Sequence, residues 1–511
     1  MMALPEAFLS ETRRLLGDET ADALFRALET DAPSVSVRLN PLKPSRAWTK
    51  ETTRQVPWCE TGRQLSERPR FTFDPLLHAG CYYVQEAASM FVEQAYRTLS
   101  RFVTPRRVLD LCAAPGGKST LWRSLLPADC LLVANDPVLP RARILSENLL
   151  KWGSSATVCT SAFASAFQPL AGFFDVIAAD VPCSGEGMFR KDEGAIQDWS
   201  PAAVEKCAAR QWEIVRDVWP ALREGGFMVY STCTFNRTEN EDQVERICRE
   251  LGAEPVEIPL EEEWGIVGNV TDSATPVCRF LPGRTPGEGF FLALLRKTSA
   301  TPSARCPKTK PLRQPDNASR KILAEWLDAP SNFRLVQADE NNVLALPEAV
   351  ADDASLLFSL LRPLHCGVPL AEKKGRKYVP AHALALSVHL CRTAFPEAEL
   401  DLNQALAYLR REPLVLPVSV PRGIVLAVWE GHPLGFLNNL GSRANNLYPS
   451  AWRIRHEERT READDERNKL CGNLCVPPDS FSNMKIISCV KFELDFRGQI
   501  FTRRRSIAVA M

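Results

Sequence analysis

The sequence has no net charge and no apolar stretch of membrane-spanning length, and its first residues do not show the pattern of a leader peptide. Its 62 lysines and arginines match 62 aspartates and glutamates. Charge alone therefore neither supports nor excludes a nucleic-acid partner, because a basic face can be balanced by acids elsewhere. The longest apolar candidate, residues 414–429, is interrupted by Pro417, Pro421 and Arg422, so we expect no membrane partner. No basic segment followed by an apolar one opens the chain, which argues against a signal peptide.

The sequence also lacks a disulfide framework and a zinc motif. Its 16 cysteines are scattered over 511 residues, and the close pair Cys471 and Cys475 has no nearby histidine. Disulfide scaffolds are typical of short secreted chains, and structural zinc sites show two CxxC-like halves. We therefore expect free thiols, no metal and a cytoplasmic location.

The length requires more than one hydrophobic core. Strand and helix patterns alternate over residues 101–298, which predicts an α/β domain with a Rossmann-like, doubly wound parallel sheet. Residues 1–100 indicate a small α+β region with helices first. A linker rich in proline and charge is expected at 299–318, and an α+β or β-barrel-like module at 319–458. Residues 459–511 are interpreted as a disordered or loosely attached tail.

Two cysteines directly follow predicted strands. Cys183 lies in DVPCSGEG after the apolar run 173–179, and Cys233 lies in YSTCT after the run 227–230. The carboxyl ends of parallel strands form the ligand crevice of an open α/β sheet, so both thiols are predicted to face that crevice. Free cysteines are more often small buried hydrophobes; that is our interpretation of Cys130, Cys159, Cys207 and Cys248.

A glycine-rich turn upstream predicts a cofactor site. It lies between a strand and a helix, where backbone amides can face a ligand, and it lacks the GxGxxG and P-loop spacings. Asp136 ends the next strand, the usual place of an acid that binds ribose hydroxyls, although Asp-Pro also suits a helix cap. An adenosine ligand without a phosphate clamp is favoured, and S-adenosylmethionine fits best. The turn consists of Cys112, Ala113, Ala114, Pro115, Gly116, Gly117 and Lys118.

Two thiols beside such a ligand suggest methylation of carbon-5 of cytosine. That carbon becomes nucleophilic only after a thiolate has added to carbon-6, and a base must then remove the carbon-5 proton. Asp180, three residues before Cys183, suits a contact with the N3 and amino edge of the base. The target base has to leave its stack to reach a crevice.

Three segments resemble the Sun-type RNA (cytosine-5) methyltransferases: DLCAAPGGK at 110–118, DVPCSGEGMFRKD at 180–192 and YSTCTFNRTENE at 230–241. The segments at 36–43 and 79–90 are similar to the N-terminal region of bacterial members that act on small-subunit ribosomal RNA. Residues 428–454 are similar to their C-terminal RNA-binding module. The resemblance extends over roughly residues 3–457.

The resemblance implies roles for single residues. Cys233 is the nucleophile, and Cys183 assists proton removal and product release; in DNA cytosine methyltransferases the Pro-Cys cysteine attacks instead. Two departures stand out: residues 159–162 contain no acid to face the adenine, and Gly283 replaces a frequent histidine. The implied cofactor contacts are residues 112–118, Asp136, Arg141 and Asp180.

The sequence therefore predicts a monomeric, S-adenosylmethionine-dependent RNA cytosine-5 methyltransferase acting on small-subunit ribosomal RNA. The alternatives are the same chemistry on transfer RNA or DNA, or a non-catalytic ribosome-assembly factor that binds RNA. Cations would neutralise phosphates and aromatic rings would stack on unpaired bases. The candidate cations are Arg38, Lys43, Arg190, Lys191 and the run 373–377, and the candidate rings are Tyr82, Tyr83, Trp429 and Tyr448.

Overall fold

The computed structural model describes residues 3–49, 51–301 and 312–455. The predicted tail at 459–511 lies outside the described residues, as do residues 302–311 of the predicted linker. Among the helices of the described part, none is long and apolar enough to span a bilayer.

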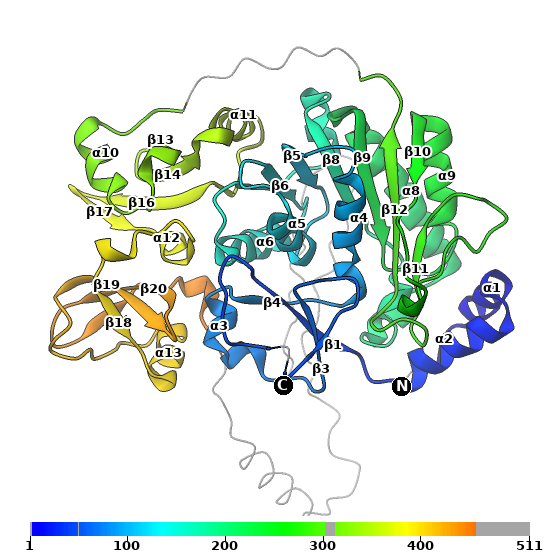
Figure 1. Cartoon of the computed structure of the whole chain (residues 1–511), viewed down its shortest axis with the longest axis horizontal. Coiled ribbons are helices and arrows are strands. Elements are labelled where there is room, and N and C mark those ends of the chain that lie inside the picture. Colours follow the sequence, from blue (N-terminus) through cyan, green and yellow to red (C-terminus); the bar gives the residue numbers. More distant parts are fainter. Residues whose placement is uncertain (1–2, 50, 302–311, 456–511) are drawn as a thin grey trace, which may run out of the picture. The chain divides into compact units, whose positions relative to one another are not determined.

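A nine-stranded sheet forms the centre of the fold (Figure 1), in the order β10-β12-β9-β8-β5-β6-β7-β15 with β11 paired to β12. Five neighbouring strands are parallel, as the alternating pattern predicts, and the predicted fold class is confirmed. The parallel strands are β5 (Arg107–Asp110), β6 (Leu131–Asn135), β7 (Thr157–Thr160), β8 (Phe174–Asp180) and β9 (Leu222–Thr232).

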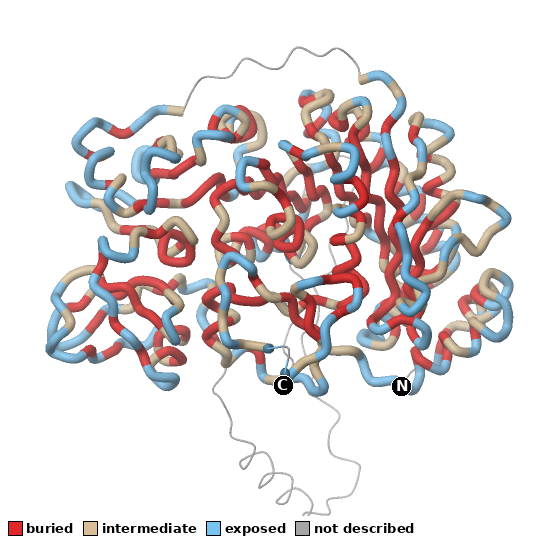
Figure 2. Tube along the Cα trace, in the orientation of Figure 1, coloured by how far each residue is buried: buried red, intermediate tan, exposed pale blue. Residues whose placement is uncertain are grey.

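Helices cover both faces of this sheet because successive strand residues point to opposite sides. Leu109 and Ile177 pack with the first set of helices, whereas Val108 and Val176 pack with the second. Figure 2 shows the buried residues concentrated along these strands. The first set is α8 (Pro201–Val218), α9 (Glu241–Ile247) and α11 (Ala351–Leu361); the second includes α4 (Val92–Leu99) and α5 (Gly117–Leu125), with α6 (Leu139–Trp152) beside Ala134.

The edges of the sheet differ from the sequence prediction. One late apolar strand is predicted at 289–295, but the structure adds two short antiparallel partners to it. At the other edge, a two-residue strand from the C-terminal part pairs with β7. Strands of two to four residues carry too weak a periodic signal to be read from sequence. These elements are β10 (Ala253–Val256), β11 (Cys278–Phe280), β12 (Phe290–Lys297) and β15 (His365–Cys366).

The N-terminal region begins with two helices and continues with a four-stranded sheet, β2-β3-β1-β4, with a short third helix before β4. Phe8 and Leu24, from the two helices, pack in one cluster with Phe189, Trp199 and Phe235, which follow the two cysteine motifs. The elements are α1 (Glu6–Leu16), α2 (Asp18–Thr30), β1 (Val35–Leu39), β2 (Arg54–Gln55), β3 (Gly62–Leu65), α3 (Pro75–His78) and β4 (Tyr82–Val84).

The C-terminal part contains two four-stranded sheets. The first consists of β13 (Phe333–Gln337), β14 (Asn342–Pro347), β16 (Val368–Lys374) and β17 (Lys377–Pro380). The second consists of β18 (Glu397–Glu399), β19 (Gly423–Trp429), β20 (His432–Asn439) and β21 (Ala444–Asn446). The helices of this part include α10 (Asn317–Ala324), α12 (His382–Leu386) and α13 (Leu402–Leu409).

Candidate active site

Cys183 and Cys233 lie in contact beyond the carboxyl ends of two neighbouring parallel strands. Asp180, which ends β8, is in register with Ser231 near the end of β9, so the two following loops leave the sheet side by side. The two Sγ atoms are 3.2 Å apart, and the backbone N–H of Cys233 donates to Cys183 Sγ at 3.4 Å. Both residues are partly exposed.

The surroundings of Cys183 favour its protonated form. The side-chain hydrogen bond between Cys183 and Cys233, burial, and the charges of Cys233 and Glu239 raise the pKa of the Cys183 thiol well above its ordinary value. Two thiolates in contact would repel each other, so the pair supplies at most one readily formed thiolate. Cys183 therefore keeps its proton at neutral pH.

Glu186, three residues after Cys183, holds the loop that carries Cys233. Its Oε2 accepts hydrogen bonds from the backbone N–H groups of Phe235 at 2.7 Å and Asn236 at 3.0 Å. Its Oε1 accepts from the indole N–H of Trp199 and from Asn236 Nδ2, both at 3.0 Å. Four donors and no acceptor surround this buried carboxylate, which is why an acid is required there.

Glu239 lies on the loop that carries Cys233 and binds the loop that carries Cys183. It accepts hydrogen bonds from the backbone N–H of Ser184 at 2.9 Å and from its hydroxyl at 2.5 Å. Gln211 on α8 and Asn236 donate to it at 2.7 and 2.8 Å. Burial raises the pKa of Glu239, and the hydrogen bonds from Ser184 and Asn236 oppose that shift.

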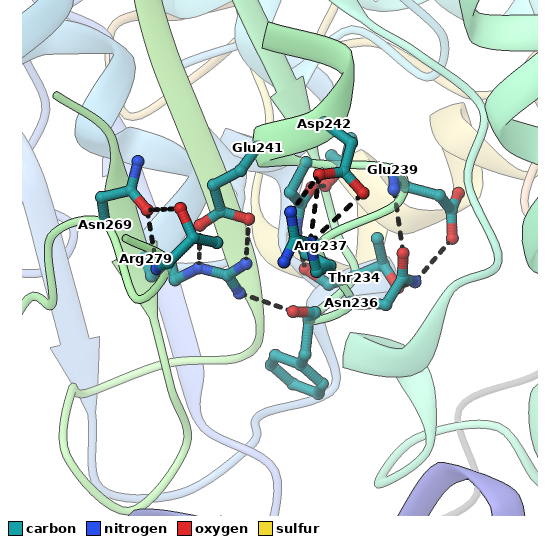
Figure 3. Close-up of polar contacts among 12 residues, drawn as sticks. Thr234, Asn236, Arg237, Glu239, Glu241, Asp242, Asn269 and Arg279 are labelled. Carbon is teal, nitrogen blue, oxygen red and sulfur yellow. Dashed lines mark hydrogen bonds and ion pairs between the residues drawn. The ribbon is translucent and has the colours of Figure 1, made fainter. Parts of the chain in front are cut away.

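A buried ion pair also holds the loop that carries Cys233 (Figure 3). Arg279 on β11 pairs with Glu241, and its Nη1 donates to the carbonyl oxygen of Phe235 at 2.5 Å. The backbone that carries Cys233 is thus tied to the first turn of α9 and to the antiparallel edge of the sheet.

Asp180 and Lys118 form an ion pair next to the cysteines. Lys118 Nζ lies 2.9 Å from Asp180 Oδ2, and the Ser231 hydroxyl donates to Asp180 Oδ1 at 2.7 Å. Burial lowers the pKa of Lys118, but the charge and hydrogen bond of Asp180 outweigh it, so this pKa is raised. Lys118 stays protonated, and it links the glycine-rich turn to the strand end before Cys183.

The glycine-rich turn is held by side chains of α6. Arg141 Nη2 donates to the Ala114 carbonyl at 3.0 Å, and Asn148 Nδ2 donates to the Pro115 carbonyl at 2.8 Å. Gly116 has a φ of +116°, a left-handed conformation that glycine adopts without strain. Cys112, at the start of the turn, is a half-buried thiol whose pKa is raised by burial.

Carboxylates end three adjacent strands of the sheet: Asp110 on β5, Asp136 after β6 and Asp180 on β8. Asp136 Oδ1 accepts from the backbone N–H of Val138 at 2.9 Å, as a residue at a helix start does, and its Oδ2 lies 3.4 Å from Arg141. Asp110 Oδ2 accepts from Ser119 at 2.6 Å. Its Oδ1 is buried and has no hydrogen-bond partner among the described residues.

The sequence departs from the family pattern at residues 159–162 and at Gly283, and the structure shows what surrounds each position. In the segment 159–162, the Thr160 hydroxyl donates to Asn135 Oδ1 at 2.8 Å. Its proton is therefore not available for a hydrogen bond to a ligand. Gly283 has a φ of +89°, and a Cβ added there would lie 3.0 Å from the carbonyl oxygen of Ala23 on α2. A histidine at 283 is excluded by this close approach.

Several predicted RNA contacts are wrong because the side chains are buried. Arg38 is fully buried and donates to Gln85, Gly117 and Thr120, at the start of α5. Tyr82 and Tyr448 are each 1% exposed.

The lysines and the remaining arginine are also engaged within the protein. Lys43 Nζ donates to two carbonyl oxygens, and Arg190 and Lys191 both pair with Glu288. Tyr83 and Trp429 are half-buried, and the run 373–377 forms an exposed hairpin tip between β16 and β17.

Sequence reasoning missed the polar network that fixes the two loops. Glu186 and Glu239 lie within the quoted motifs, but the sequence analysis assigns them no role. Glu186 carries a usable signal, because it stands three residues after Cys183 in a segment of small or apolar residues, whereas Glu239 lies in a polar segment and carries none. Asn236 and Gln211 gave no such signal.

Three family models match the chain. The model described as 16S rRNA methyltransferase RsmB/F matches residues 102–296. The N-terminal domain of 16S rRNA methyltransferase RsmF matches residues 4–87, and the methyltransferase RsmF PUA domain matches residues 395–454.

Relatives match over most of the chain. Ribosomal RNA small subunit methyltransferase F of Escherichia coli O157:H7 is 31% identical over 477 residues, which cover 87% of this chain and 95% of the relative. The protein of the same name from Salmonella paratyphi A is 31% identical over 481 residues, with the same coverage. A solved structure, PH0851, has a TM-score of 0.51 at 22% identity and covers 57% of this chain and 66% of that chain. The predicted resemblance is confirmed: this chain belongs to the RsmB/F family of 16S rRNA methyltransferases.

Proposed function

We propose that this protein transfers a methyl group from S-adenosylmethionine to carbon-5 of a cytosine in small-subunit ribosomal RNA, through a covalent bond between Cys233 and the base. The observation that carries the proposal is the 3.2 Å contact between the Cys183 and Cys233 sulfurs at the carboxyl ends of β8 and β9. Few reactions require two thiols at one point, and methylation through a carbon-6 adduct is one of them.

Cys233 supplies the nucleophile. The raised pKa of Cys183 disfavours its thiolate, which leaves Cys233 as the better candidate for the attacking thiolate. Its attack on carbon-6 forms a carbon–sulfur bond and places electron density on carbon-5, which then accepts the methyl group. The family resemblance implies the same assignment.

Asp180 and Cys183 act on the base and its protons. Asp180, paired with Lys118 and adjacent to the thiols, accepts a hydrogen bond from the amino edge of cytosine. After methylation, carbon-5 carries both the methyl group and a proton. Once Cys233 is bonded to carbon-6 and no longer charged, the thiol proton of Cys183 passes to water. The Cys183 thiolate then accepts the carbon-5 proton, the carbon–sulfur bond breaks and the Cys233 thiolate is restored.

The residues of the strand ends fit S-adenosylmethionine, which supplies the methyl group when bound. The ligand carries a sulfonium and an ammonium charge, and three carboxylates end the adjacent strands β5, β6 and β8. The unpaired Asp110 Oδ1 leaves one buried acceptor available. The proposed contacts are Cys112, Ala113, Ala114, Pro115, Gly116, Gly117, Lys118, Asp136, Arg141 and Asp180.

RNA binding is proposed for the parts flanking the catalytic domain. The relatives are named for ribosomal RNA of the small subunit, and the chain matches the RsmF PUA domain. The exposed cations at 373–377 suit phosphate contacts. We place the protein in the cytoplasm, where thiols stay reduced, and propose that it acts as a monomer.

Bisulfite sequencing tests the substrate. Small-subunit ribosomal RNA and transfer RNA from a strain lacking the gene are compared with the parent strain, and the purified protein is then added to the deficient RNA or subunits. We expect loss of 5-methylcytosine at one or a few ribosomal positions and its restoration by the protein. Loss confined to transfer RNA, or no loss in any RNA, would contradict the proposal.

A further inference from the structure

We propose that Cys183 and Cys233 are also an oxidative modification site, at which hydrogen peroxide closes a reversible disulfide and thereby stops methyl transfer. Formation of the disulfide depends only on the geometry of the two thiols. The effect on methyl transfer rests on the function proposed above.

The two sulfurs need little movement to bond. They are 3.2 Å apart, and a disulfide bond is about 2.0 Å long, so the gap to be closed is roughly 1.2 Å. The backbone already holds the pair in place, since Gly187 N–H donates to the Cys233 carbonyl at 2.9 Å. Glu186 and Glu239 fix the loops on either side. Rotation of the two side chains can therefore close the bond without unfolding.

Access and reactivity set this pair apart from the other described cysteines. Both residues are partly exposed, so a molecule as small as peroxide reaches them. No other pair of cysteines in the described ranges makes a sulfur–sulfur hydrogen-bond contact. Buried thiols with a raised pKa react slowly, and this group comprises Cys59, Cys81, Cys130, Cys159, Cys278 and Cys366.

The oxidation balances as follows. The Cys233 thiolate attacks one oxygen of peroxide, forming a sulfenic acid and releasing hydroxide, which takes up a proton to become water. Cys183 then attacks the sulfenic sulfur, the S–S bond forms, and the hydroxyl leaves with the proton of Cys183 as a second water. Two thiols are oxidised by two electrons, and one peroxide is reduced to two waters. A dithiol such as dithiothreitol reverses the reaction.

The disulfide would inactivate Cys233 as a nucleophile and would also protect its sulfur from further oxidation. An isolated sulfenic acid is oxidised further to the sulfinic acid, which dithiothreitol does not reduce. With Cys183 in contact, the sulfenic acid is captured first. The position of Cys183 thus serves both the release step and the recovery of the enzyme after oxidation.

Peptide mapping of the full-length protein tests the inference. The reduced protein is treated with hydrogen peroxide, its remaining thiols are alkylated and it is digested with trypsin. We expect peptide 152–190, which contains Cys183, to be linked to peptide 224–237, which contains Cys233, and the link to disappear with dithiothreitol. The Cys159→Ser variant must keep the link, because Cys159 shares the first peptide but is buried. The Cys183→Ser variant must lose it and carry sulfinic acid at Cys233.

A control variant removes two other partly exposed thiols, Cys207→Ala with Cys391→Ala, and should form the same link. Peroxide-treated wild type should lose at least nine-tenths of its methylation rate and regain most of it with dithiothreitol. Absence of the linked peptides in a protein that methylates RNA when reduced would overturn this inference alone. Linked peptides in a protein that methylates no RNA would instead overturn the proposed function.

Discussion

Glu186 and Glu239 share one amide group: Asn236 Nδ2 donates to Glu186 Oε1 at 3.0 Å and to Glu239 Oε1 at 2.8 Å. Each carboxylate comes from one cysteine-bearing loop and binds backbone N–H groups of the other. The two loops are therefore fixed relative to each other through Asn236. We infer that these hydrogen bonds hold the loops that carry Cys183 and Cys233 at the separation that the reaction requires.

Replacing Glu186 by glutamine tests this role. Glutamine would turn an NH₂ group toward donors that need an acceptor, so the loop carrying Cys233 should shift. We expect Glu186→Gln to lower kcat at least tenfold while the dissociation constant for S-adenosylmethionine changes less than threefold. Single-turnover methylation and calorimetry measure the two quantities.

The matched control is Glu205→Gln on α8, the same chemical change at an exposed position. It should leave both quantities unchanged. An unaltered kcat in Glu186→Gln would show that the hydrogen bonds to Phe235 and Asn236 do not position the nucleophile.

Gly283 tests the close approach between α2 and the loop after β11. Alanine there meets both an unfavourable left-handed backbone and the Ala23 carbonyl oxygen, so Gly283→Ala should lower the free energy of unfolding by about 2–4 kcal/mol. Gly375→Ala is the control, because Gly375 also has a positive φ but nothing within 4 Å of an added Cβ. It should cost only about 1 kcal/mol. Equal urea midpoints for the two variants would contradict the assigned contact.

The raised pKa of Asp110 predicts that the free energy of unfolding depends on pH. Burial raises its pKa from 3.8 to about 7, against the hydrogen bond from Ser119. The folded state therefore binds this proton more tightly, so the stabilisation is fully present below pH 4 and is lost as the pH rises through about 7. Asp110→Asn removes it, and between pH 5 and pH 8 the variant should lose less stability than wild type, by roughly 2–3 kcal/mol. Urea denaturation of the ligand-free proteins checks this, and parallel pH profiles would contradict it.

The sequence predicted what depends on regular patterns. Alternating apolar runs predict the two strands now seen as β8 and β9, and the position of Cys183 and Cys233 just beyond them predicts thiols at the carboxyl edge of the sheet. That the two strands are neighbours is known only from the structure. The two short antiparallel strands beside β12 and the pairing of His365–Cys366 with β7 were not predictable, because they depend on contacts between distant segments. Local patterns contain no information on such pairings.

Burial of charged and aromatic side chains was the main error. Arg38 and Arg190 look like surface cations in the sequence, but each is enclosed by partners from segments between roughly 50 and 100 residues away. The same holds for Tyr82, whose hydroxyl donates to Asp74. Which cation faces solvent is decided by tertiary packing. Among the predicted cations, the hairpin tip at 373–377 and Lys191 are exposed.

Trapping of the covalent adduct tests the central claim most directly. Wild type, Cys183→Ala and Cys233→Ala proteins are incubated with S-adenosylmethionine and small-subunit ribosomal RNA, and the products are separated on a denaturing gel with and without ribonuclease. Cys183→Ala should give a slowly migrating, ribonuclease-sensitive band, because attack proceeds and release is blocked; Cys233→Ala should give neither band nor methylation. An adduct with Cys233→Ala but not with Cys183→Ala, or full turnover by Cys233→Ala, would contradict the account.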